Sequence, residues 1–207
     1  MIKALLLIFE PVATWERIVQ TQRRWLFVLT GFLLPLLLLT SLAEGFGLVQ
    51  WGVVQKDMLR PKEFGIAEAS VYLGAQALLS ILIVIVAAWL IKSLGETFHG
   101  RHSFGQAFTA VAYGLSPLFA FRVLDAFPVI SPWVAWGIGI LLSTAVLYHG
   151  LPRVMLPDPP HAFGLYLMSV ILLIIITGLA RFVTAWYLAE IGRASCRERG
   201  EISVVAG

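Results

Sequence analysis

Residues Trp25 to Ala43 read WLFVLTGFLLPLLLLTSLA, an uninterrupted run without a charged side chain. A helix of roughly 19 residues rises about 28 Å, close to the roughly 30 Å thickness of the hydrocarbon core of a bilayer. A helix in lipid also satisfies its own backbone hydrogen bonds. The run therefore predicts a transmembrane helix.

Four further runs of roughly 19 to 23 residues have the same apolar character. They are Ala69 to Ile91, Ser103 to Phe121, Val129 to Tyr148 and Ala162 to Ala180. Hydrophobic residues make up 59% of the chain and the mean hydropathy is +0.87, which leaves too little polar surface for a water-soluble globule. The predicted fold class is an all-α polytopic membrane protein with five transmembrane helices.

The C-terminal residues have a different origin in our interpretation. Ile191 to Arg199 read IGRASCRER, which translates a run resembling a common short-read sequencing adapter, and the continuation fits except at Gly200 and Glu201. We therefore interpret residues 191–207 as a non-native tail that replaces the natural sequence from about Glu190 onward. The remaining chain divides into a cytoplasmic amphipathic segment, residues 1–24, and a five-span membrane domain, residues 25–188.

Excluding the tail changes what the charges and the cysteine imply. Residues 1–190 hold 12 basic and 10 acidic residues, a net charge of +2, so we expect no nucleic-acid partner. The one cysteine, Cys196, lies in the tail, so the rest of the chain offers no disulfide, thiol nucleophile or thiolate ligand.

Basic residues beside the spans predict the orientation. With the N-terminus inside, seven Lys and Arg residues flank the spans on the inner side and five on the outer side; the inner set is Lys3, Arg17, Arg23, Arg24, Lys92, Arg101 and Arg153, and the outer set is Lys56, Arg60, Lys62, Arg122 and Arg181. Arg23 and Arg24 directly precede the first span, which usually dominates. We expect a cytoplasmic N-terminus and an external C-terminus.

The segment before the first span shows a helical pattern. From Pro11, apolar residues recur at Val12, Trp15, Ile18 and Val19, which predicts a short amphipathic helix. We expect this helix to lie in the headgroup layer with Trp15 as an interfacial anchor. The alternative is a docking site for a cytoplasmic partner.

The third span carries both a start signal and a break signal. Ser103 and Gln106 have the spacing of a capping box, which predicts the helix start. Ala110 and Gly114 form a small-residue pair for close helix contact. Pro117 lies inside the span and predicts a kink, because proline removes a backbone donor.

The fourth span begins after a second turn signal. Ser131 is a predicted N-cap and Pro132 the first helical residue, so the third and fourth spans should form a tight hairpin. Gly139 and Ser143 are another small pair. The span ends near Tyr148 and continues into a proline-rich loop at residues 156–160.

At these residues the chain resembles the bacterial branch of the Yip1 family, small membrane proteins with five spans. The matching pieces, in chain order, are Phe9-Glu10-Pro11 with Trp15 and Ile18, Gly100-Arg101 with Ser103-Phe104 and Gln106-Ala107, Ala112 to Pro117, and Tyr148 to Pro152 with Met155. Their order and spacing carry the resemblance, which covers roughly residues 5–188. It marks Tyr113, Gly114, Pro117, Tyr148 and Pro152 as family-motif positions.

The resemblance implies membrane residence, in the inner (cytoplasmic) membrane of a bacterium. In eukaryotic relatives the family implies vesicle traffic with prenylated small GTPases as partners. Bacteria lack that machinery, and the acidic Asp-Leu-Tyr-Gly-Pro motif of many eukaryotic members is not found in this sequence. We therefore expect no small GTPase partner; the expected partners are the lipid bilayer and either a membrane protein or a second copy of the chain.

Motifs of catalysis and of cofactor binding are missing from the sequence. It holds no Gly-rich phosphate loop, no Gly-x-Ser-x-Gly elbow and no His-Glu-x-x-His helix. Ser116 and Ser143 occupy helix-packing positions, so an intramembrane hydrolase is disfavoured. We predict a protein that is not an enzyme and needs no cofactor.

Four histidines and a glutamate raise the hypothesis of a metal site. Glu96, His99 and His102 could join His149 and His161 on the inner face to hold a transition metal. However, two glycines interrupt any helix that would align the first three. We interpret these side chains as solvated polar residues and predict no metal site.

Two classes of function stay open. The first is a non-enzymatic scaffold or adaptor in membrane organisation or trafficking-like processes. The second is a small transporter or lipid-handling protein, because polar groups inside membranes often mark pathways. The residues that motivate it lie in or beside spans, chiefly the third and fifth: Pro35, Gln76, Pro117, Arg122, Asp125 and Arg181.

Arg122 and Asp125 are the candidate functional residues of that second class. They lie three positions apart, so a salt bridge could join them at the outer end of the third span, where Arg122 could snorkel to the interface. In this interpretation the pair only ends the span. The functional alternative is that Asp125 faces the bundle interior as a proton or cation site.

The orientation can be tested with reporter fusions. A periplasmic reporter fused after Lys62 should be active, and one fused after Arg101 should be silent, because the predicted topology places the loop after the first span outside and the loop after the second span inside. A cytoplasmic reporter at the same two positions is the control and should give the opposite result. The reverse pattern would show that the N-terminus lies outside.

Overall fold

The computed structural model describes residues 2–21, 23–51, 65–97, 103–127 and 129–205, and the side chains of the last helix as far as Tyr187. These residues form helices and no strand. Five helical segments are long and apolar enough to cross a membrane: Trp25–Trp51, Ala69–Thr97, Phe104–Ala126, Pro132–Met155 and Pro159–Tyr187. The predicted all-α, five-span fold is therefore confirmed.

The first span is continuous but changes its helical type. It comprises α3 (Trp25–Val28), a π-helical turn (Leu29–Leu33) and α4 (Leu34–Trp51). Pro35 has no N–H to donate to the carbonyl of residue 31, and its ring crowds that carbonyl. A wider π-helical turn just before the proline relieves this crowding. The span also runs eight residues past Ala43, its predicted end, because the carboxylate at Glu44 does not stop the helix.

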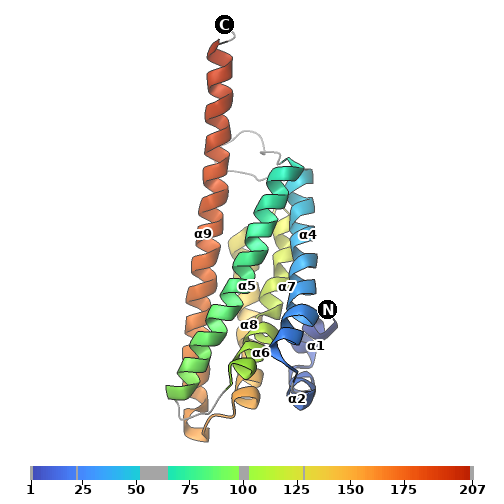
Figure 1. Cartoon of the computed structure of the whole chain (residues 1–207), viewed down its shortest axis with the longest axis vertical. Coiled ribbons are helices and arrows are strands. Elements are labelled where there is room, and N and C mark those ends of the chain that lie inside the picture. Colours follow the sequence, from blue (N-terminus) through green and yellow to red (C-terminus); the bar gives the residue numbers. More distant parts are fainter. Residues whose placement is uncertain (1, 22, 52–64, 98–102, 128, 206–207) are drawn as a thin grey trace.

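The second, fourth and fifth spans also exceed their predicted lengths. They are α5 (Ile66–Thr97), α8 (Pro132–Met155) and α9 (Ala162–Val205), the last preceded by a short 3₁₀ turn at Pro159–His161. Helices continue into polar flanks that a hydropathy window leaves out. The C-terminal part of α9 extends beyond the other helices (Figure 1); the interpretation of residues 191–207 as adapter sequence stays a prediction.

The third span lies at the centre of the bundle. It comprises α6 (Phe104–Gly114), α7 (Ser116–Phe121) and a 3₁₀ turn, η2 (Arg122–Ala126), and 67% of its apolar window is buried, against 28% for the second and fifth spans. The predicted capping box is present: Ser103 N–H donates to Gln106 Oε1 (3.0 Å) and Gln106 N–H to Ser103 Oγ (3.3 Å). Because this span is central, its side chains can contact several other spans at the candidate site.

The predicted break in the third span falls between α6 and α7. Leu115 leaves helical geometry with φ −84° and ψ 0°, and Pro117 occupies the second position of α7. Side chains satisfy the backbone there: Ser116 Oγ donates to the Tyr113 carbonyl (2.6 Å), and Leu118 N–H donates to Ser143 Oγ of α8 (3.2 Å). Ser143 thus acts as an N-cap supplied by a neighbouring helix.

Small residues allow the third and fourth spans to pack as the predicted hairpin. A side chain at Gly114 would overlap Leu147, and one at Gly139 would lie 2.9 Å from Leu118 Cα. Pro132 begins α8 as predicted, but the Ser131 side chain makes no capping hydrogen bond. The hairpin therefore depends on backbone contact between α7 and α8 more than on its turn.

The N-terminal residues form α1 (Ile2–Phe9) and α2 (Pro11–Thr21), which pack at the end of the bundle where α6 begins and α8 ends (Figure 1). The predicted amphipathic helix is confirmed in α2. The prediction that Trp15 is an interfacial anchor is wrong: its side chain is 0% exposed, and Nε1–H donates to the Val146 carbonyl (3.1 Å). A partner carbonyl in α8 permits full burial of the polar indole group.

Gly150 is the position on α8 that accepts the Trp15 ring. Gly150→Ala should destabilise the protein by about 1–3 kcal/mol, because a Cβ there would overlap the indole and force it to move. The measurement is thermal unfolding of the purified protein in detergent. Gly137→Ala is the matched control, since it lies on the same helix with open space around it.

We expect Gly137→Ala to be neutral or slightly stabilising, because alanine favours helix by roughly 0.5–1 kcal/mol over glycine. Equal unfolding temperatures for the two variants would contradict the role of Gly150.

Candidate functional site

A buried ion pair joins the first and third spans. Arg122 Nη2 lies 2.6 Å from Glu44 Oε2, and the two residues are 9% and 4% exposed. Two residues of α5 complete the arrangement: Ser80 Oγ accepts from Arg122 Nη1 (3.0 Å), and Tyr72 donates from its hydroxyl to Glu44 Oε1 (3.2 Å). Three spans thus meet at one charge pair.

Close packing of α4 against η2 makes this pair possible. Gly47 faces the backbone of Ala126, and any side chain at position 47 would overlap that backbone. Glu44 lies seven residues before the end of the span at Trp51, which is about 10 Å into the helix at 1.5 Å per residue. A charge at this depth is costly unless it is paired, and Arg122 supplies the pair.

A second ion pair joins the third and fifth spans. Arg181 Nη2 lies 2.7 Å from Asp125 Oδ2, and the side chains are 11% and 5% exposed. Arg181 also donates to the carbonyl of Pro132, at the start of α8 (3.2 Å). With two acidic and two basic side chains, the ionic cluster of Glu44, Arg122, Asp125 and Arg181 is formally neutral.

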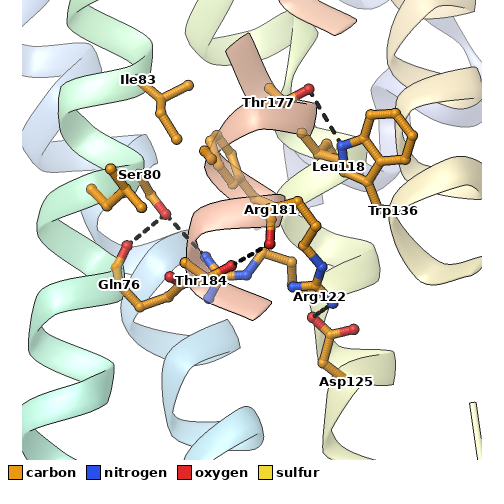
Figure 2. Close-up of a pocket in the computed structure, with 13 residues that line it drawn as sticks. Gln76, Ser80, Ile83, Leu118, Arg122, Asp125, Trp136, Thr177, Arg181 and Thr184 are labelled. Atoms are coloured by element: carbon orange, nitrogen blue, oxygen red, sulfur yellow. Dashed lines mark hydrogen bonds and ion pairs between the residues drawn. The ribbon is translucent and has the colours of Figure 1, made fainter. Parts of the chain in front are cut away.

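The ionic cluster borders a small cavity of about 50 Å³ between α5, α7, η2, α8 and α9. Figure 2 shows its lining, with Gln76 and Ser80 on α5 and Thr177, Arg181 and Thr184 on α9. Gln76 Oε1, Arg122 Nε and Asp125 Oδ1 are buried and have no hydrogen bond in the described structure, whereas Asp125 Oδ2 is held by its ion pair with Arg181. A cavity this size has room for about three water molecules, which such atoms would bind.

Arg122 and Asp125 do not pair with each other, so that part of the prediction is wrong. Each binds a residue of another span, because Glu44 and Arg181 would otherwise be unpaired charges inside the membrane. The prediction that the Arg122 side chain extends to the membrane surface is also wrong, because the side chain is buried and paired with Glu44. Burial of Asp125 in the bundle agrees with the arrangement that the functional alternative required.

Three of the family-motif residues lie in the core at the break of the third span. Tyr113 packs against Phe32 in a tilted arrangement, with ring centroids 4.2 Å apart, and makes an edge contact with Trp15 at a centroid distance of 6.3 Å. Gly114 contacts Leu147, and Pro117 opens α7. All of these contacts are structural.

Tyr148 and Pro152 lie at the opposite end of the bundle from the ionic cluster, since they belong to the last turns of α8. Tyr148 is 54% exposed and its ring centroid lies 5.3 Å from that of Tyr166. Together with His149 and Arg153 they line a cavity of about 310 Å³. The predicted site residues therefore fall into three separate places.

Sequence reasoning missed Glu44, Tyr72 and Ser80. Glu44 directly follows Ala43, the predicted end of the first span, and no further charge follows before Lys56. A lone carboxylate in such a run was the available signal for a buried partner. No comparable pattern marks Tyr72 or Ser80.

The histidine hypothesis can be followed only in part. His99 and His102 lie outside the described residues, whereas His149 and His161 lie at the end of α8 and the start of the fifth span. In the described ranges, no three His, Cys, Asp or Glu side chains lie close enough to share a metal ion.

The Glu44–Arg122 pair can be tested with single and double variants. Glu44→Gln should destabilise the protein by about 3–5 kcal/mol in thermal unfolding, because it leaves Arg122 buried without a counter-charge. The double variant Glu44→Gln with Arg122→Gln should lose less free energy of unfolding than the two single variants lose together.

Glu96→Gln is the control for this prediction. It removes a carboxylate from the exposed Lys92–Glu96 pair (3.3 Å) and should cost about 0–1 kcal/mol. Strict additivity in the double variant would show that Glu44 and Arg122 are not energetically coupled.

Comparison with known proteins agrees with this architecture. The family model described as Yip1 domain matches residues 5–181, which include all five spans up to Arg181 of the ionic cluster. Searches of curated proteins and of solved structures each returned no match. With five apolar spans and a family match over most of its length, the chain is a multi-pass membrane protein that belongs to the Yip1 domain family.

Proposed function

We propose that this Yip1 family protein is a non-enzymatic membrane scaffold or adaptor, residing in the inner membrane of a bacterium with its N-terminus in the cytoplasm. One observation carries the proposal: the charged side chains inside the bundle bind each other around a space of only about 50 Å³. Small-molecule sites commonly measure about 300–1,000 Å³. These ion pairs between spans stabilise one arrangement of the helices.

The intramembrane serines support a role without catalysis. Ser116 Oγ donates to a carbonyl of its own span, and Ser143 Oγ accepts from the backbone of α7. A serine nucleophile needs an adjacent base that accepts its proton, whereas these hydroxyls bind backbone groups at the helix break. Their position is that of structural caps.

A scaffold acts through its surface, so its partners would be a membrane protein or a second copy of the chain. The ionic cluster ties the first, second, third and fifth spans together. This arrangement would present a constant helical surface to a partner. Loss of the ties should therefore weaken association as well as stability.

The proposal can be tested by cross-linking in native membranes followed by mass spectrometry. A scaffold should give the same partner, or the same homodimer contact, in independent preparations. Glu44→Gln should reduce that cross-link several-fold, because it breaks the tie between spans, whereas the exposed control Glu96→Gln should leave it unchanged. The absence of a reproducible contact, together with solute flux in liposomes, would contradict the scaffold.

One observation favours the second candidate, a small transporter or lipid-handling protein. Asp125 Oδ1, Gln76 Oε1 and Arg122 Nε are buried in residues that line the cavity and have no hydrogen bond in the described structure, and such groups can mark an ion or proton path. In this case liposomes with the purified protein should show proton or cation flux that Asp125→Asn abolishes and Glu96→Gln preserves.

A further inference from the structure

The largest of the cavities described here lies far from the ionic cluster, beside the N-terminal helices. It measures about 410 Å³ and is lined by Ile18, Val19, Arg23, Arg24, Trp25, Ser103, Gly105, Gln106, Thr109 and Val154. These residues come from α2, the link to α3 and the first residue of α3, the N-cap and first two turns of α6, and the last turn of α8. The volume falls in the range of small-molecule sites, roughly 300–1,000 Å³.

The position of this cavity is that of the headgroup layer. Trp25 is the first residue of the first span, Ser103 immediately precedes the third, and Val154 lies next to the last residue of the fourth. Three span ends therefore meet at the same level, which is the boundary between hydrocarbon and water. Trp25 belongs to the residue type enriched at that boundary.

The charge of the lining is one-sided. Arg23 and Arg24 both contribute to it, and none of the ten lining residues carries a carboxylate. The Arg23 guanidinium lies 4.2 Å from the centre of the Phe27 ring, a cation–π contact that restrains this side chain. Arginine matches phosphate oxygens with paired donors.

The remaining walls suit the rest of a lipid headgroup. Ile18, Val19 and Val154 provide an apolar side, while Gln106 and Thr109 add polar groups. The first turn of α6 also lies in the wall, and the N-terminal end of a helix adds weak attraction for an anion. A soluble phosphate would use the polar side alone.

We propose that this cavity binds the phosphodiester headgroup of an anionic phospholipid, with Arg23 and Arg24 as the residues that hold the phosphate. The site would fix the N-terminal helices against the membrane surface. It is separate from the ionic cluster, so it does not depend on the scaffold proposal.

The test uses the purified full chain in neutral detergent and measures binding of phosphatidylglycerol by native mass spectrometry. Phosphatidylcholine with the same acyl chains is the comparison lipid. Wild-type protein should retain phosphatidylglycerol and release phosphatidylcholine. Arg23→Gln with Arg24→Gln should weaken phosphatidylglycerol binding about 30-fold, the factor that two basic side chains contribute near anionic lipid.

Arg17→Gln with Lys92→Gln is the matched control. It removes two positive charges from α2 and the end of α5 without touching the cavity lining, so binding should stay within about twofold of wild type. Equal loss in both double variants would overturn the proposal, since it would indicate attraction to overall charge. Equal retention of the two lipids by wild-type protein would also overturn it.

Two further measurements separate the sources of the phosphate and guard against a misfolded variant. Glycerol phosphate in solution should compete only weakly; competition as strong as that of the lipid would overturn the assignment to a membrane lipid. A photoactivatable phosphatidylglycerol on wild-type protein should label peptides that contain residues 23–25 and 103–109. Labelling confined to the cavity of Tyr148 and Pro152 would overturn the site.

Discussion

The Arg122 guanidinium is the centre on which the arrangement of the spans depends. It is buried inside a membrane bundle, where lipid cannot balance its charge, and it reaches Glu44 of the first span and Ser80 of the second. Each of these contacts requires a particular helix at a particular rotation. A shift of the first, second or third span would leave a charge or a donor unpaired in a medium of low polarity.

Hydrogen bonds between uncharged groups also stabilise the central span. The break before Pro117 frees backbone groups, and Ser116 and Ser143 bind them. Trp15 adds a third tie, from the N-terminal helices to the carbonyl of Val146. Each of these bonds satisfies a buried group whose exposure to lipid would cost more than the bond itself contributes.

The two ends of the bundle have different chemistry. At the end away from the N-terminal helices, opposite charges lie against each other and cancel around a small cavity. At the N-terminal end, basic side chains line a larger cavity, and none of the described residues that line it carries a carboxylate. The first arrangement stabilises the bundle, and the second leaves positive charge available to a ligand at the membrane surface.

Features that depend on neighbours along the chain could be predicted from sequence. The five spans follow from length and hydropathy, the start of α6 from Ser103 and Gln106, and the break from Pro117. Each of these is a local property of one helix, because hydrogen bonding within a helix joins residues three or four apart. The family resemblance rested on the same local motifs.

Only the tertiary structure decided which charges pair and which aromatic ring is buried. Arg122 binds a carboxylate 78 positions away rather than Asp125 three positions away, and the Trp15 indole finds its acceptor 131 positions away. Such partners depend on which helix faces meet, and small residues such as Gly47 and Gly150 allow that approach. Hydropathy records how apolar a segment is, but it carries no information on the helix face that each side chain occupies against another span.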